Sequence, residues 1–183
     1  MRSIRLQFFF FAAALGLTAS AGFAAAHSYS FAFTDVDGNK LSFTDHSITI
    51  VVVTTSKEID KARIVADRVP DYCLANPAYR MITLLRFQGK HYAPTRAVIN
   101  AMVRRRLDVE AQRLRQRYVA KNIARDARKD AFAVTDFDGA AGSQLGIPAG
   151  SMAFQVLVLG RSGELLRRWT DVPTREELDA VLK

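Results

Sequence analysis

Sulfur is scarce in this 183-residue chain, which has a single cysteine, Cys73. One cysteine cannot form a disulfide within the chain, so the packed core alone must hold the fold unless Cys73 pairs with a second molecule. The three histidines, His27, His46 and His91, are scattered, without the spacing or the cysteine partners of a metal site. We therefore expect no metal and no cofactor.

Long apolar runs are also missing, except near the N-terminus. There, two arginines precede an apolar stretch that ends in Ala24-Ala25-Ala26, a pattern typical of a cleavable export signal. The sequence thus predicts a signal peptide over residues 1–26 and a periplasmic or secreted mature domain over residues 27–183. The alternative is an uncleaved anchor in the inner membrane, because residues 6–26 carry no charge and could just span a bilayer.

The full chain is 24% charged and 49% hydrophobic, which suits one packed domain. Alternating apolar residues around Asp35-Val36-Asp37-Gly38-Asn39 predict a β-hairpin. The β-branched run Ile48–Val53 predicts a central strand buried on both faces. A helix capped by Ser56 should follow and be divided at Pro70. Later strands are expected over 81–87, 131–135, 154–159 and 164–169, with helices over 140–145 and from Pro173.

One helix stands out for its length and its charge. An apolar stripe at spacings of three and four predicts it from Pro94 to about Lys129, a length of roughly 50 Å. We expect a bend, a break or a protruding end. Its basic face is either simply solvated or an anion-binding surface, with five candidate residues: Arg104, Arg105, Arg106, Arg113 and Arg117.

The order of these elements resembles the thioredoxin-like superfamily, in particular its exported thiol-disulfide interchange and peroxiredoxin-like branch. The resemblance covers about residues 31–183, and its residues are Phe33–Leu41, Phe132–Gly139, Phe154–Leu165 and Pro173–Leu178. It implies an α/β fold, a three-layer sandwich with a mixed central sheet and an N-terminal β-hairpin, here with one unusually long basic helix.

Two landmarks of that family are missing. Active members carry Cys-x-x-Cys where the first core strand enters its helix, because a helix N-terminus lowers the pKa of the first thiol. The resemblance places Thr54, Thr55, Ser56, Lys57, Glu58 and Ile59 there, without sulfur. The cis-proline that shapes the substrate groove falls on Ser151. The sequence therefore assigns no catalytic residue, and dithiol exchange is not expected.

Other candidate residues have plain interpretations. Cys73 lies late in the first helix, so we expect a structural thiol; the alternatives are a dimer through an intermolecular disulfide and a single-cysteine peroxidase. Asp35, Asp37 and Asn39 depart from the spacing of an EF-hand calcium loop, and with Asp136 and Asp138 they are expected to be turn residues.

The function predicted from sequence is an exported, redox-inactive, thioredoxin-like domain that binds or scaffolds in the cell envelope. The expected partner is an unidentified protein or an anionic envelope component, not nucleic acid. Two alternatives stay open: a thiol redox enzyme that uses Cys73, and a membrane-tethered structural protein with an anion-binding helix.

Overall fold

The computed structural model describes residues 28–42, 47–89 and 91–183. The predicted signal segment, His27 and His46 lie outside the described residues. Within the described ranges, no helix has both the length and the apolar character needed to cross a membrane.

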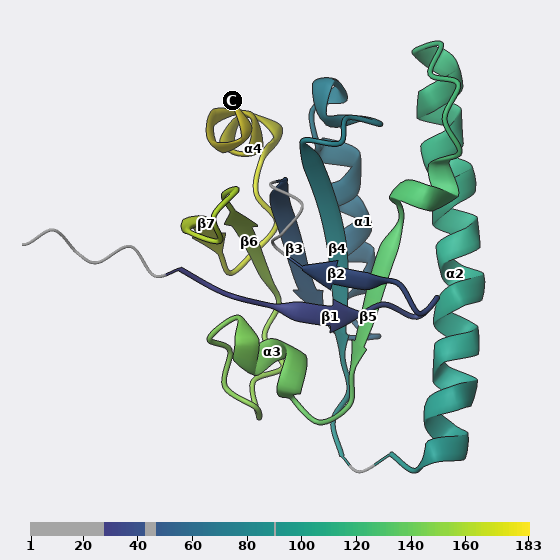
Figure 1. The fold of residues 1–183 in the computed structure, drawn as a ribbon, viewed down its shortest axis with the longest axis vertical. Coiled ribbons are helices and arrows are strands. Elements are labelled where there is room, and N and C mark those ends of the chain that lie inside the picture. The colour runs from purple at the N-terminus through teal and green to yellow at the C-terminus, as the bar shows by residue number, and fades with distance from the viewer. Residues whose placement is uncertain (1–27, 43–46, 90) are drawn as a thin grey trace, which may run out of the picture.

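A five-stranded mixed sheet forms the centre of the domain (Figure 1). The β-branched run lies in the central strand, which pairs in parallel with one neighbour and antiparallel with the other. Val53 lies opposite Gln155, so the predicted strands near residues 50 and 156 are side by side, as expected. Across the sheet the order is β5 (Phe132–Asp136), β4 (Tyr79–Arg86), β3 (Ile48–Thr54), β6 (Gln155–Leu159) and β7 (Leu165–Trp169).

Both faces of this sheet are covered, which gives the predicted three layers. Successive side chains of a strand point to opposite faces, so Val51 and Val53 pack in one core cluster while Ile50 and Val52 pack in another. The first core lies under the hairpin and a short helix: β1 (Ala32–Thr34), β2 (Lys40–Ser42) and α3 (Ala140–Gln144). The second lies under α1 (Ile59–Arg68) and α4 (Arg175–Leu182).

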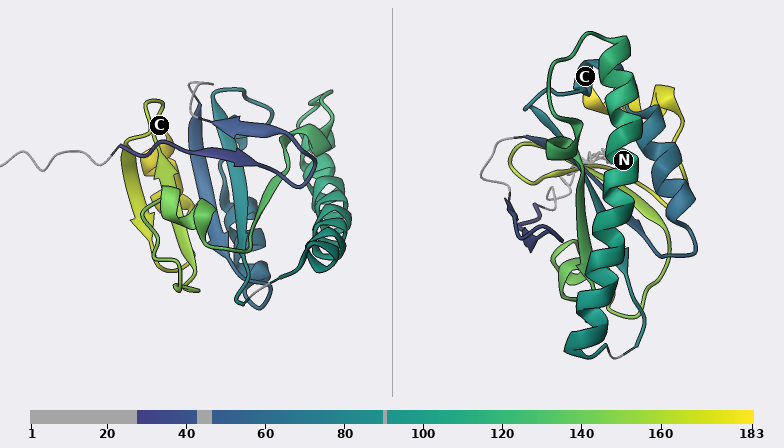
Figure 2. Two further views of the ribbon diagram at one scale, coloured as in Figure 1. Left: turned by 60° about the horizontal axis from the view of Figure 1, so that its bottom comes forward. Right: turned by 90° about the vertical axis from the view of Figure 1, so that its right-hand side faces the viewer.

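The long helix α2 (Ala93–Ala120) stands at the β5 edge of the sheet (Figure 2). Its Leu107 packs with Leu85 and Ala133 in a third small cluster. The helix ends before the predicted Lys129, so that boundary was wrong. Asn122 adopts the left-handed conformation at φ 55°, and the amides of residues 122 and 123 bond back to the carbonyls of residues 119 and 118. This is a Schellman ending built on asparagine instead of glycine; η3 (Ala127–Asp130) follows it.

The start of α1 also differs from the prediction, whereas its end does not. Ser56 does not cap this helix: Glu58 is the N-cap residue and makes no side-chain capping bond. The division at Pro70 is confirmed, because α1 ends at Arg68 and the short η2 (Asp71–Cys73) follows.

Candidate functional site

The candidate site lies at one edge of the sheet, where β3, β4 and β5 end and β6 begins. The six residues that the resemblance gives to the active-site position run from Thr54, which ends β3, to Ile59, which begins α1. Thr54 is buried at 1% exposure, Ser56 and Lys57 are exposed, and a turn closes through the Glu58 amide and the Thr55 carbonyl at 3.2 Å. The loop presents hydroxyl, ammonium and carboxylate groups, and no thiol.

This loop lies beside the segment that enters β6. Lys61, in the first turn of α1, places its Nζ 5.2 Å from the centre of the Phe154 ring and 3.0 Å from a Glu58 carboxylate oxygen. The hydrogen bond to Glu58 is the main reason why the pKa of Lys61 is raised. Residues before α1 and before β6 therefore share one surface.

A buried ion pair holds the segment that contains Ser151, the position that the resemblance gives to the cis-proline. Arg86 ends β4 and Asp136 ends β5, opposite each other in the parallel register. Their side chains are only 2% and 1% exposed, and Arg86 Nε lies 3.3 Å from Asp136 Oδ2. The guanidinium also donates to the carbonyls of Pro148 at 3.1 Å, Ala149 at 2.8 Å and Ser151.

We call Arg86 and Asp136 together the clamp. Asp136 binds a second segment of the chain. Its carboxylate accepts bonds from the amides of Ala141 at 3.3 Å and Gly142 at 3.0 Å, at the start of α3. No peptide bond in the described ranges is cis. The Ser151 segment is thus shaped by a guanidinium that satisfies three carbonyls, not by a cis-proline.

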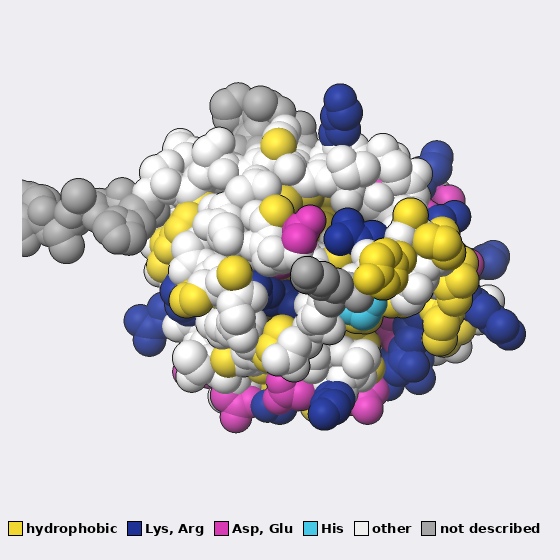
Figure 3. Space-filling view, turned by 90° about the horizontal axis from the view of Figure 1, so that it is seen from below, with side chains coloured by type: hydrophobic (Ala, Val, Ile, Leu, Met, Phe, Trp, Pro, Cys, Tyr) yellow, Lys and Arg dark blue, Asp and Glu magenta, His cyan; other side chains and the backbone are white. Residues whose placement is uncertain are grey.

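A hollow of about 540 Å³ opens next to the clamp, between the ends of β4 and β5 and the start of α2. Phe87 and Phe137 stack there with ring centres 5.0 Å apart. His91 lies 5.4 Å from the Phe137 ring, and the Arg96 guanidinium lies over that ring at 5.1 Å. Figure 3 views the molecule from this side and shows basic and hydrophobic side chains gathered together. The guanidinium favours an anionic group, and the ring faces favour stacking with an aromatic group.

Cys73 lies away from this edge. The helix α1 begins at the site, and Cys73 lies beyond its other end, in η2, packed in the core under α1 and α4 at 7% exposure. Burial, with the nearby Asp179 carboxylate, raises the pKa of the thiol to about 12, although Arg117 acts in the opposite direction. The thiol is therefore protonated at neutral pH and shielded from solvent.

The five candidate arginines of α2 do not act alike. Arg117 binds the carbonyls of Ala66 and Val69, at the end of α1, and the Asp71 carboxylate, each at 2.9 Å. Arg106 and Arg113 make only long ion pairs, 3.9 Å to Asp60 and 4.0 Å to Glu110. Arg104 and Arg105 are exposed. Part of the predicted anion-binding set thus has a structural role in joining α1 to α2.

Asp35 and Asp138 are turn residues, as predicted. The same prediction for Asp136 was wrong, because Asp136 is the last residue of β5 and is buried in the clamp. Asp35 accepts bonds from the amides of Asp37 at 3.0 Å and Asn39 at 2.7 Å, and Asp138 accepts one from the amide of Ala140 at 3.1 Å. Within the described ranges, no three His, Cys, Asp or Glu side chains are grouped as metal ligands would be.

Sequence reasoning missed the role of the clamp and of the neighbouring aromatic hollow. The signal was a charged residue directly after two leucines at the end of a strand, in Leu84-Leu85-Arg86, and an aspartate at the end of the next strand along the chain. A buried charge needs a partner of opposite sign, so these two ends could have been paired.

Comparisons with known proteins agree on the fold. No family model matches the chain, and no curated protein matches it. An exposed lipoprotein thioredoxin of Streptococcus pneumoniae is 13% identical, with a TM-score of 0.52 over 84% of this chain and 97% of its own. A protein described as a thioredoxin from Neisseria meningitidis is 15% identical, with a TM-score of 0.50 over 84% of this chain and 88% of its own. Together with the sheet order, these similarities show that the chain has the thioredoxin-like fold, carried by a sequence with a single cysteine.

Proposed function

We propose that this chain is an exported thioredoxin-like domain that carries out no dithiol exchange and instead binds or scaffolds in the cell envelope. One observation carries the proposal: the junction of β3 and α1 has no sulfur, and the sole thiol is buried at the other end of α1 with its pKa raised to about 12.

The chemistry explains why this matters. Thiol-disulfide exchange and peroxide reduction both begin with an accessible thiolate. With a pKa near 12, only about one Cys73 in 10⁵ would be ionised at neutral pH. Burial then restricts the approach of a disulfide or a peroxide further. A disulfide between two copies of the chain would meet the same obstacle.

Export is supported by the composition of residues 1–26, with basic residues, an apolar stretch and small residues in order. The pneumococcal structure of the same fold is described as an exposed lipoprotein. Mass measurement of the protein purified from its native envelope tests this: a start near His27 supports cleavage, whereas an intact N-terminus supports a membrane tether.

Binding at the sheet edge is supported by the surface that remains there. The loop from Thr54 to Ile59, the clamped segment around Ser151 and the hollow beside Phe137 lie where relatives of this fold carry out chemistry. Polar and aromatic groups in a concave surface are typical of ligand sites, and here they accompany no thiol.

Thiol reactivity tests the proposal directly. Native protein should react slowly with Ellman's reagent and quickly once it is unfolded. It should reduce neither insulin disulfides nor peroxide above the rate of Cys73→Ser. Ser56→Cys is the positive control, because an exposed thiol beside the N-terminus of α1 should react rapidly. Fast native labelling with Cys73-dependent reduction would overturn the proposal.

A further inference from the structure

A second concave surface lies on the face of α2 that is turned away from solvent. A groove of about 430 Å³ runs between α1 and α2 above the sheet. Thr83 and Leu85 of β4 line its floor, Ile59 and Ala66 line the α1 side, and Val103 and Leu114 line the α2 side. Its volume is in the range of about 300–1,000 Å³ that is typical of small-molecule sites. Apolar walls of this kind favour a hydrocarbon ligand.

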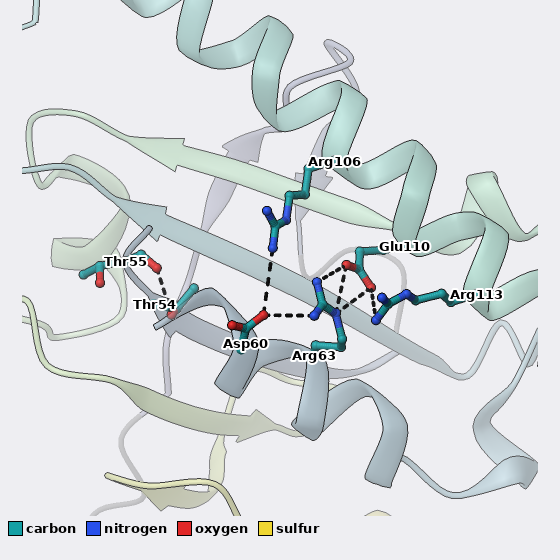
Figure 4. A network of polar contacts seen from close by, with 7 residues as sticks. All are labelled: Thr54, Thr55, Asp60, Arg63, Arg106, Glu110 and Arg113. Carbon is teal, nitrogen blue, oxygen red and sulfur yellow. Dashed lines mark hydrogen bonds and ion pairs between the residues drawn. The ribbon is translucent and has the colours of Figure 1, made fainter. Parts of the chain in front are cut away.

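Arginines outnumber carboxylates at the mouth of the groove, where Arg63, Arg106 and Arg113 pair with Asp60 and Glu110. Arg63 reaches across the mouth from α1 to α2, where its Nη2 lies 2.7 Å from Glu110 Oε1 (Figure 4). Its Nη1 lies 2.9 Å from Asp60 Oδ1. Arg106 and Arg113, also on the lining, make ion pairs of only 3.9 and 4.0 Å, and their side chains are 53% and 52% exposed. These two guanidinium groups keep donors available for an anion at the rim.

We propose that this groove binds a free long-chain monocarboxylate, a fatty acid. The hydrocarbon chain lies along the floor, and the carboxylate binds Arg106 and Arg113. The Arg63–Glu110 contact across the mouth suits a thin linear molecule, because a helix or a folded surface could enter only by breaking it. Ser56 and Ile59 line the groove, but the proposal requires no thiol chemistry, so it stands or fails separately from redox inactivity.

Calorimetric titration of the folded protein tests the ligand class. The probes are sodium octanoate, decanoate, dodecanoate and tetradecanoate, each below its micelle concentration. Affinity should rise about fourfold for each added methylene that the groove buries. Dodecyltrimethylammonium, with the same chain and the opposite charge, should bind much more weakly. If no carboxylate of the series binds, or if the cationic amphiphile binds equally well, the proposal is wrong.

Matched variants locate the site. Arg106→Glu with Arg113→Glu should weaken dodecanoate binding about tenfold or more, because the carboxylate loses two charge-assisted bonds. Arg104→Glu with Arg105→Glu changes the net charge equally on the same helix but outside the groove lining, and should leave binding unchanged. An equal loss in both pairs would show diffuse attraction to the basic helix and overturn the site.

A third variant tests the floor. Thr83→Phe should fill the groove and abolish dodecanoate binding while the circular dichroism spectrum stays native. Unchanged binding in folded Thr83→Phe would overturn the proposal; if this variant does not fold, the paired arginine variants decide. Binding to anionic vesicles without binding of free dodecanoate would also overturn it, because the basic helix would then act as a membrane surface.

Discussion

Substituting Asp136 by asparagine should show how much the clamp contributes to the free energy of unfolding. Arg86 and Asp136 are almost fully buried, and the guanidinium lies 3.3 Å from the carboxylate. Asp136→Asn keeps the size of the side chain but leaves the Arg86 charge in the interior without a counter-charge. Removing one partner of a buried pair costs about 3–5 kcal/mol, a large part of the roughly 5–15 kcal/mol that stabilises a typical domain.

Urea denaturation followed by circular dichroism measures this loss, and at about 2–4 °C per kcal/mol the melting temperature should fall by roughly 10 °C. Arg86→Met combined with Asp136→Asn should cost less than the sum of the single changes, by about 0.5–3 kcal/mol, because the double variant leaves no unpaired charge. A loss below about 1 kcal/mol in Asp136→Asn, or strict additivity of the two changes, would refute the reasoning.

Three further predictions concern stability. Gly142→Ala should cost about 1–3 kcal/mol, because the new Cβ would lie 3.1 Å from the Arg86 guanidinium carbon, whereas Gly150→Ala, with nothing within 4 Å, should be nearly neutral in the same urea assay. Thr174→Ala should cost about 1 kcal/mol in thermal melts, because it removes the capping box of α4. The pKa of Asp71 is lowered to about 2, first by Lys121, so its contribution is present above about pH 4 and is lost as the pH falls towards 2. Asp71→Asn should flatten this part of the stability profile by at most about 1 kcal/mol, since the side chain is 41% exposed.

Much of the fold could be predicted because its strands have strong local signals. The run Ile48–Val53 is β-branched without interruption, and such a run favours a strand covered on both faces. The end of α2 had no comparable signal. Asn122 adopts φ 55°, but asparagine is found in many conformations, and the sequence contains no glycine or proline there to mark the end.

At the candidate site, only the absence of a thiol could be predicted from the sequence. The missing sulfur between Thr54 and Ile59 is visible in the sequence, but the groups that replace the family landmarks are not. Arg86 and Asp136 are far apart along the chain and become neighbours only through the parallel register of β4 and β5. The groove likewise depends on how far α2 stands from α1, a distance that no local pattern specifies.

The clamp also changes what the sheet edge can recognise. In the segment before β6, the carbonyls of Pro148, Ala149 and Ser151 all accept bonds from Arg86, so their bonding capacity is directed into the protein. A ligand at this edge would therefore be recognised mainly by side chains, such as Arg96 over the Phe137 ring. Under the proposed binding function, specificity at this edge would depend on aromatic and cationic groups and not on a cysteine.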